Sequence, residues 1–179
     1  MRKKLAEKSG VSLVEMLCAT IILILLGLLL NTGLQLSLKS YRELRAESET
    51  QLLLATAIDA LADDLRYARR VETDADGALK SYHSDSYGKD TAITVDDETD
   101  QLLAAGKRVL PPGAYGKGAY HIQGLEITYD KDTLLFTVKL EVTAPGIPGA
   151  GAKTPEEGVT IRCLNPAMTA PEGEGGTTP

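Results

Sequence analysis

Alternating acidic residues give the chain one candidate metal site. Glu72, Asp74 and Asp76 are followed by Gly77, which is the order of ligands and turn glycine that opens a calcium-binding loop. The twelfth position of such a loop should be a bidentate glutamate, but here it is His83. Because the match fails at a principal ligand, we interpret this segment as a solvated acidic loop.

The other residues capable of metal or catalytic chemistry are scattered. A second acidic run, from Asp96 to Asp100, is interpreted as another solvated loop, with calcium binding as the open alternative. His83 and His121 have no Cys or acidic neighbours at zinc-site spacing. No nucleophile motif, phosphate-binding loop or carboxylate pair is visible. The sequence therefore predicts a protein that is not an enzyme and uses no metal or other cofactor.

Four tyrosines lie among small residues, at positions 82, 87, 115 and 120. Tyrosine mixed with Gly, Ser and Ala is typical of adaptable binding surfaces. The same tyrosines can instead serve as aromatic anchors within irregular loops. We favour the anchoring role.

A single carboxylate, Glu15, interrupts the apolar segment VSLVEMLCATIILILLGLLL, residues 11–30. Roughly 20 apolar residues are enough for a helix to cross a bilayer. A carboxylate inside such a helix costs roughly 2.5 to 3.5 kcal/mol and calls for a partner, unless it stays hydrated at the interface. Four basic residues precede the segment. They predict a cytoplasmic N-terminus and an external remainder.

The apolar segment differs from an ordinary secretory signal. No small-residue A-x-A site follows it, and Glu15, Met16 and Leu17 precede Cys18 where a lipoprotein signal has small residues. The second cysteine, Cys163, is predicted to lie across the membrane boundary from Cys18. We therefore expect no disulfide between them.

The helix is expected to continue beyond the membrane. Residues 39–70 contain no Pro or Gly and are rich in good helix formers. Apolar residues recur there at helical spacing and predict one buried stripe. This stripe consists of Leu44, Gln51, Leu54, Ile58, Leu61, Leu65 and Ala68.

The clearest β pattern lies in the second half of the chain. Leu125 to Tyr129 and Leu134 to Val142 alternate apolar and polar residues around an Asp-Lys-Asp turn, which predicts a hairpin. A last strand is expected at Val159 to Cys163, after a Gly- and Pro-rich loop. Shorter strand candidates lie at 92–95 and 107–110, whereas 72–100 otherwise reads as acidic loop.

The residues from Lys8 to Glu15, KSGVSLVE, resemble the cleavage and methylation motif of type IV prepilins and type II secretion pseudopilins. The resemblance implies that a prepilin peptidase cuts between Gly10 and Val11 and methylates the new amine of Val11. It also implies an assembly role for Glu15, which becomes the fifth mature residue and pairs with the Val11 amine of a neighbouring subunit. Val11 departs from the Phe that is usual in the family.

This resemblance implies a structural subunit of a type IV pilus or pseudopilus filament. We favour a minor subunit, because residues 60–69 are similar to the helix end of J-type minor pseudopilins and no usable disulfide is present. Implied partners are the prepilin peptidase, other pilin or pseudopilin subunits and an inner-membrane assembly platform. The alternative is a non-polymerising, single-pass membrane-anchored extracellular binding or sensory protein.

The predicted fold class is α+β and pilin-like, with a long N-terminal helix packed on an antiparallel sheet. The expected parts are a leader at 1–10, a helix at 11–71 that crosses the membrane at about 11–38, a β-rich domain at 72–164 and a disordered tail at 165–179. The globular domain should lie outside the cytoplasmic membrane and later in an extracellular or cell-surface filament. Without the leader the net charge falls from −6 to −9, which argues against direct nucleic-acid binding.

Overall fold

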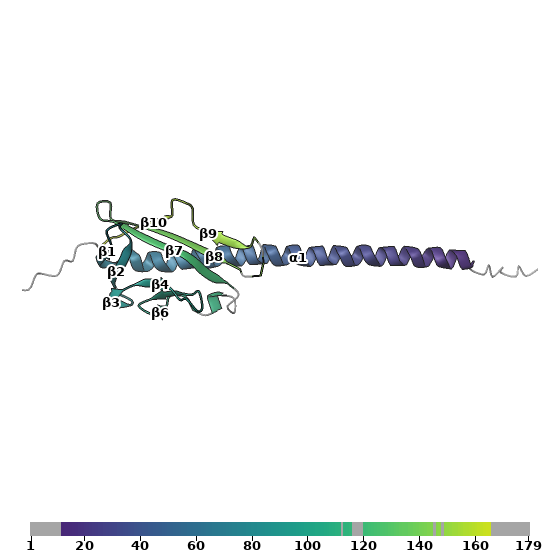
Figure 1. The fold of residues 1–179 in the computed structure, drawn as a ribbon, viewed down its shortest axis with the longest axis horizontal. Coiled ribbons are helices and arrows are strands. Elements are labelled where there is room, and N and C mark those ends of the chain that lie inside the picture. Colours follow the sequence, from purple (N-terminus) through teal and green to yellow (C-terminus); the bar gives the residue numbers. More distant parts are fainter. Residues whose placement is uncertain (1–11, 112, 116–119, 145, 148, 166–179) are drawn as a thin grey trace, which may run out of the picture. The chain divides into compact units, whose positions relative to one another are not determined.

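The computed structural model describes residues 12–111, 113–115, 120–144, 146–147 and 149–165. The chain divides into two compact units, Met1–Arg42 and Glu43–Pro179. Within the described residues there are one α-helix and ten strands (Figure 1). In chain order they are α1 (Leu13–Leu65), β1 (Arg69–Thr73), β2 (Leu79–Ser84), β3 (Gly88–Thr91), β4 (Ile93–Val95), β5 (Leu102–Ala104), β6 (Lys107–Arg108), β7 (His121–Asp130), β8 (Leu135–Thr143), β9 (Gly151–Lys153) and β10 (Val159–Arg162).

The first unit contains the apolar part of α1. Its most apolar stretch has a mean hydropathy of 2.8, and the helix is long enough to cross a membrane. The few hydroxyls there bond within the helix: Thr20 Oγ1 donates to the Leu17 carbonyl at 2.8 Å, and Thr32 Oγ1 to the Leu28 carbonyl at 2.9 Å. Because their hydrogens are satisfied locally, these side chains are compatible with an apolar surrounding.

The C-terminal end of α1 lies at Leu65, earlier than the predicted end at 71. The last turn tightens, with the Ala68 amide donating to the Leu65 carbonyl at 3.2 Å, and β1 begins at Arg69. Past the helix, the Arg66 carbonyl accepts a 2.8 Å bond from the Leu164 amide. Cys163 Sγ donates to the Ala68 carbonyl at 3.3 Å. Contacts with the end of the chain, rather than a Gly or Pro, therefore replace the lost helical bonds.

The helix face that is buried in the second unit differs from the predicted stripe. Leu61 and Leu65 are buried as expected, and Leu54 and Ile58 are partly buried against the core. Leu44 is 67% exposed and Gln51 is also exposed, so the prediction is wrong there. The centre of the buried face is instead formed by Ala46, Thr50, Leu53, Ala57, Leu61 and Leu65. Small residues on this face let the sheet approach closely, so burial there does not follow side-chain size.

The principal sheet is antiparallel and has the order β10-β8-β7, with β9 also pairing with β8 (Figure 1). The predicted hairpin is confirmed, with Tyr129 opposite Phe136 and Ile127 opposite Val138. Its turn is held by Asp130, whose carboxylate accepts bonds from the Asp132 amide at 2.9 Å and the Thr133 hydroxyl at 2.7 Å. The predicted last strand is present as β10.

Two small antiparallel sheets, β1-β2-β3 and β4-β5-β6, complete the second unit. The acidic segment 72–100 was expected to be mostly loop, and β1, β2 and β3 correct that expectation. The β1–β2 turn is tied to the principal sheet, because Ala78 forms a bridge with Thr128 and the Tyr129 amide donates to the Gly77 carbonyl at 2.9 Å. This polar segment forms strands because contacts with the rest of the fold stabilise them.

The predicted α+β class is confirmed: one long apolar helix is followed by antiparallel sheets. The core of the second unit contains residues of α1 together with one face of β8, which carries Phe136, Val138 and Leu140. Among the predicted parts, the leader 1–10 and residues 166–179 of the predicted tail lie outside the described residues.

Candidate functional site

Of the three residues predicted to act in processing and assembly, one is described. Gly10 and Val11 lie outside the described residues. Glu15 lies in the first turn of α1, which begins at Leu13, and its side chain is exposed. A negative charge at this end of a helix interacts favourably with the helix dipole. Glu15 therefore occupies an end of the helix where acidic residues are favourable.

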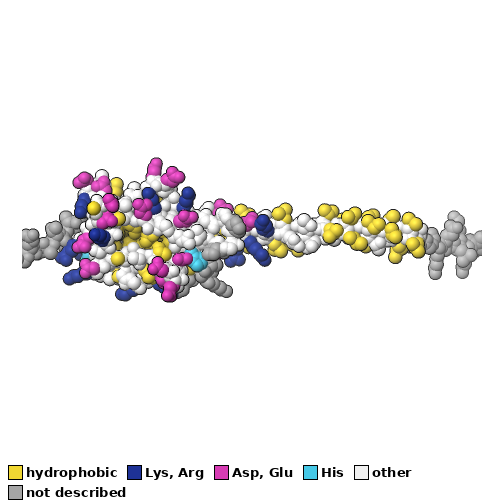
Figure 2. Space-filling view, viewed as in Figure 1, with side chains coloured by type: hydrophobic (Ala, Val, Ile, Leu, Met, Phe, Trp, Pro, Cys, Tyr) yellow, Lys and Arg dark blue, Asp and Glu magenta, His cyan; other side chains and the backbone are white. Residues whose placement is uncertain are grey.

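The surface that follows Glu15 along α1 is mostly apolar, and Figure 2 shows hydrophobic side chains dominating the face in view. Sixteen Leu, Ile, Val or Met side chains from Leu13 to Leu38 are exposed. Burying one such side chain fully is worth roughly 1.5 to 3 kcal/mol, and these side chains are 47% to 82% exposed. Leaving all sixteen in water is therefore unfavourable by on the order of 20 kcal/mol. This segment therefore requires an apolar surrounding, which lipid or a bundle of other helices provides.

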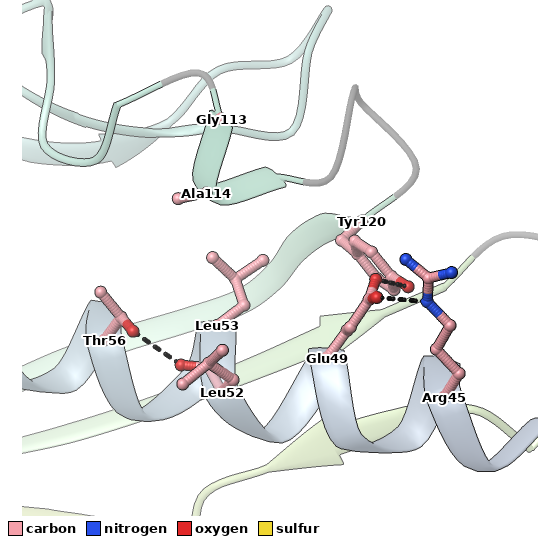
Figure 3. A pocket seen from close by; sticks show the side chains of 8 residues that line it. All are labelled: Arg45, Glu49, Leu52, Leu53, Thr56, Gly113, Ala114 and Tyr120. Carbon is pink, nitrogen blue, oxygen red and sulfur yellow. Dashed lines mark hydrogen bonds and ion pairs between the residues drawn. The ribbon is translucent and has the colours of Figure 1, made fainter.

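The second unit has a groove beside α1, with a polar group at one end (Figure 3). Glu49 accepts a hydrogen bond from the Tyr120 hydroxyl and another from Arg45 Nε at 2.7 Å. The bond from Tyr120, and then that from Arg45, lowers the pKa of the Glu49 carboxyl. Burial, followed by the bond to Glu49, raises the pKa of the Tyr120 hydroxyl to about 12. Glu49 is thus held ionised and Tyr120 neutral at physiological pH.

The groove itself is small and mostly apolar. Its volume is about 550 Å³, and its walls are formed by Leu52, Leu53, Thr56, Gly113 and Ala114 in addition to the polar group. Both oxygens of Glu49 already accept bonds within the protein. A carboxylate with a lowered pKa and occupied oxygens is a poor general base. We therefore assign these residues to the attachment of β7 to the helix.

The acidic loops have a structural role in the described residues. Asp74 Oδ1 accepts from the Asp76 amide at 3.0 Å and from the Ala78 amide at 2.8 Å. Asp96 accepts from the Glu98 amide at 3.1 Å and from Thr99 Oγ1 at 2.6 Å, and the Thr99 bond lowers the pKa of Asp96. These are turns closed by aspartate side chains. No group of three His, Cys, Asp or Glu placed to hold a metal occurs in the described part of the chain.

A buried polar network joins α1 to β2. Asp64 accepts hydrogen bonds from the Tyr82 hydroxyl and from Ser84 Oγ, the latter at 2.6 Å. Burial and then the bond to Asp64 raise the pKa of Tyr82 strongly. Ser84 Oγ in turn accepts from the Tyr87 amide at 3.0 Å. Because each polar group has a partner, this network stabilises the contact between the helix and the small sheet.

The tyrosines are packing residues rather than a binding surface. Tyr82, Tyr115 and Tyr120 are buried, and Tyr87 is half-buried. The Tyr115 hydroxyl accepts a 3.0 Å bond from the Leu102 amide. The favoured anchoring interpretation is therefore correct for the three buried tyrosines. An apolar ring with a bonded hydroxyl is the usual state of a buried tyrosine.

The two histidines differ in their surroundings. His121 Nδ1 lies 2.8 Å from Asp100 Oδ2. His83 lies on β2 opposite Arg69, and its Nδ1 is buried without a hydrogen-bond partner among the described residues. Sequence spacing gave no signal for this second arrangement, because the basic neighbours of His83 come from two other strands, β1 and β3.

Comparison with known proteins adds no family: no family model, curated protein or solved structure matches the chain. The fold and the exposed apolar segment nonetheless define a class. The described residues contain one helix that is long and apolar enough to cross a membrane, and its position near the N-terminus indicates a single-pass membrane anchor. That helix, followed by antiparallel sheets, is compatible with a membrane-anchored protein of pilin-like architecture.

Proposed function

We propose that this chain is a structural subunit of a type IV pilus or pseudopilus filament, anchored in the membrane through α1 before assembly. The observation that carries the proposal is the lone carboxylate of Glu15 in the first turn of a helix whose next 23 residues up to Leu38 are otherwise uncharged. Sixteen exposed apolar side chains explain why such a helix needs lipid or other helices. They do not explain the carboxylate, which makes insertion less favourable.

Assembly gives this carboxylate a partner. Cleavage between Gly10 and Val11 creates an amine four residues before Glu15, and the amine of a neighbouring subunit then meets the carboxylate inside a helix bundle. Pairing offsets the cost of two charges in an apolar surrounding and fixes the axial register of adjacent helices. The proposed partners are accordingly a prepilin peptidase, other pilin or pseudopilin subunits and an inner-membrane assembly platform.

The proposed role is structural and involves no catalysis by this chain. We infer that the N-terminus lies in the cytoplasm and the second unit outside; the four basic residues before the apolar segment support this orientation. Within the filament we favour a minor subunit, on the basis of the similarity of residues 60–69 to J-type minor pseudopilins. Quantitative mass spectrometry of sheared filaments tests this point, since a chain that dominates those filaments is a major subunit.

The decisive experiment replaces Glu15. In Glu15→Ala we expect unchanged or improved membrane insertion and loss of the chain from sheared filaments, measured by quantitative immunoblotting of the membrane and filament fractions. Glu15→Gln keeps the shape without the charge and should fail in the same way, whereas Glu15→Asp should retain part of the assembly. Filament entry of Glu15→Ala at the wild-type level contradicts the proposal and favours a non-polymerising membrane-anchored binding or sensory protein.

A further inference from the structure

A cluster of basic side chains lies on the small sheet β1-β2-β3. Arg69 and Arg70 from β1, His83 from β2 and Lys89 from β3 line one cavity of about 110 Å³. Arg69 and His83 are direct cross-strand partners. Arg69, Arg70 and Lys89 carry like charges that repel each other at close range, and the ion pair between Arg69 and Asp85 offsets one of the three. The remaining positive charge favours the binding of an anion.

The backbone on both sides of His83 is distorted so that these side chains converge. The β1–β2 register shifts between Arg69 and Glu72, and the β2–β3 register shifts at His83. The first irregular stretch contains Arg70, at φ 49°, and the second contains Asp90, at φ 55°. Such backbone is costly for residues with a side chain, and bulges that redirect side chains are common beside binding sites.

Two nitrogen atoms of the cluster are buried without a hydrogen-bond partner in the described part of the chain. They are Arg69 Nε and His83 Nδ1. Another nitrogen of the same guanidinium, Nη2, donates to Asp85 Oδ2 at 2.9 Å. A buried donor without an acceptor is unfavourable by about 1 to 3 kcal/mol. Both residues line the cavity, so a small shift of their side chains would let an acceptor in the cavity meet these nitrogens. Nδ1 of His83 donates when it carries the proton.

The charge and size of the cavity indicate what that acceptor is. Arg69, Arg70 and Lys89 are cationic, and Asp85 offsets one of these charges. A volume of about 110 Å³ corresponds to a few water molecules, at roughly 30 Å³ for each one in the liquid. This space suits a single small polyanion. Arginine forks and a lysine are the side chains that proteins use for phosphate.

We propose that Arg69, Arg70, His83 and Lys89 form a binding site for one phosphate group. Arg69 Nε and His83 Nδ1 bond the oxygens at the base of the cavity, and the exposed Arg70 and Lys89 provide charge at its mouth. This site is independent of α1 and of filament assembly. A free phosphate ion and a phosphate ester offer the same chemistry, and the experiment below distinguishes them.

The test uses the purified full chain in a neutral detergent. Inorganic phosphate is added against chloride at matched ionic strength, with ³¹P line broadening and the thermal midpoint Tm as readouts. With the wild type, the ³¹P signal of phosphate should broaden and phosphate should raise Tm. The control Lys131→Gln should behave in the same way, because it removes an exposed lysine of the hairpin turn outside the cavity. Glycerol 3-phosphate is then titrated. Affinity equal to that for phosphate indicates an ester ligand, and loss of affinity indicates the free ion.

Arg70→Gly separates binding from folding. Glycine adopts φ 49° without strain, so Tm in chloride should equal or exceed that of the wild type, while phosphate affinity should fall about tenfold or more, as expected for loss of one charge-assisted bond. Adding Lys89→Gln should weaken binding further. The proposal is overturned if the wild type binds neither phosphate nor glycerol 3-phosphate, or if the double variant binds phosphate as tightly as the wild type.

Discussion

At the scale of single residues, the bond between Glu49 and Tyr120 ties the helix to the start of β7 across 71 positions of the chain. Burial and this bond raise the pKa of Tyr120 to about 12, above the ordinary value of 10. The folded state therefore holds the tyrosine proton more tightly than the unfolded state does. The resulting stabilisation is fully present below pH 10 and is lost as the pH rises from 10 to 12.

We predict that Tyr120→Phe reduces this alkaline loss of stability. The wild type should lose up to about 2 kcal/mol more than the variant between pH 10 and 12, since each pKa unit corresponds to roughly 1.4 kcal/mol. Denaturant unfolding followed by circular dichroism at several pH values measures the difference. Folding lowers the pKa of Glu49, so its contribution to stability is present above the pKa of the unfolded state and is lost as the pH falls through the folded pKa. Parallel alkaline profiles for both proteins contradict the assignment.

Gly158 provides a second prediction at this scale. Its φ is 78°, and a Cβ there would lie 2.6 Å from Thr137 Cγ2 and 3.1 Å from the Val138 carbonyl oxygen. Gly158→Ala should therefore destabilise the fold by about 2 kcal/mol or more, through both strain and overlap. Gly106→Ala is the matched control, because Gly106 has φ 72° with no atom within 4 Å of the added Cβ. Equal losses in Tm for the two variants would show that the overlap is relieved.

Residue patterns in the sequence identified some of the candidate site and not the rest. Glu15 is predictable because a carboxylate in an apolar segment stands out locally. The cluster around His83 is not, because its members come from three strands and are brought together by two bulges. The positions of bulges depend on the pairing between strands. Arg70 has a positive φ, but neither its residue type nor a turn motif around it predicts one from the sequence.

At the scale of elements, the hairpin β7–β8 was predictable and the face of α1 was not. Alternation along Leu134 to Val142 reports burial directly, because each second residue points into the core. On the helix, the leucine at position 44 is exposed while Ala46 and Ala57 are buried. Alanine is compatible with either surface, so the sequence pattern identified the helix without fixing which residues meet the sheet.

The packing of α1 leads to a third prediction. Leu61 is 1% exposed within the core of the second unit, and Leu52 is 68% exposed on the same helix. Leu61→Ala should cost about 2 to 5 kcal/mol, since it removes buried methyl groups and leaves a cavity. Leu52→Ala should change stability by less than about 0.5 kcal/mol, as exposed substitutions usually do. Chemical denaturation of both variants checks this, and a larger loss for Leu52→Ala would contradict the observed helix face.

At the scale of the whole molecule, the two units differ in the exposure of their apolar side chains. The described residues of the first unit are all exposed, and from Leu13 to Leu38 they are dominated by apolar side chains. The buried core begins at Ala46 and continues to Cys163, entirely within the second unit. Because the core is contained in one unit, folding of that unit does not require residues before Glu43.

We therefore predict that a fragment of residues 43–165 folds by itself and remains monomeric in buffer without detergent. It retains every residue of the core cluster and lacks the exposed apolar side chains that drive association. Cooperative thermal unfolding by circular dichroism and a monomer mass by sedimentation are the expected results. The matched control, 12–165, should aggregate unless detergent is added, because it keeps those side chains. If the 43–165 fragment is unfolded or aggregated, the first unit contributes to folding in addition to anchoring and assembly, and the prediction is wrong.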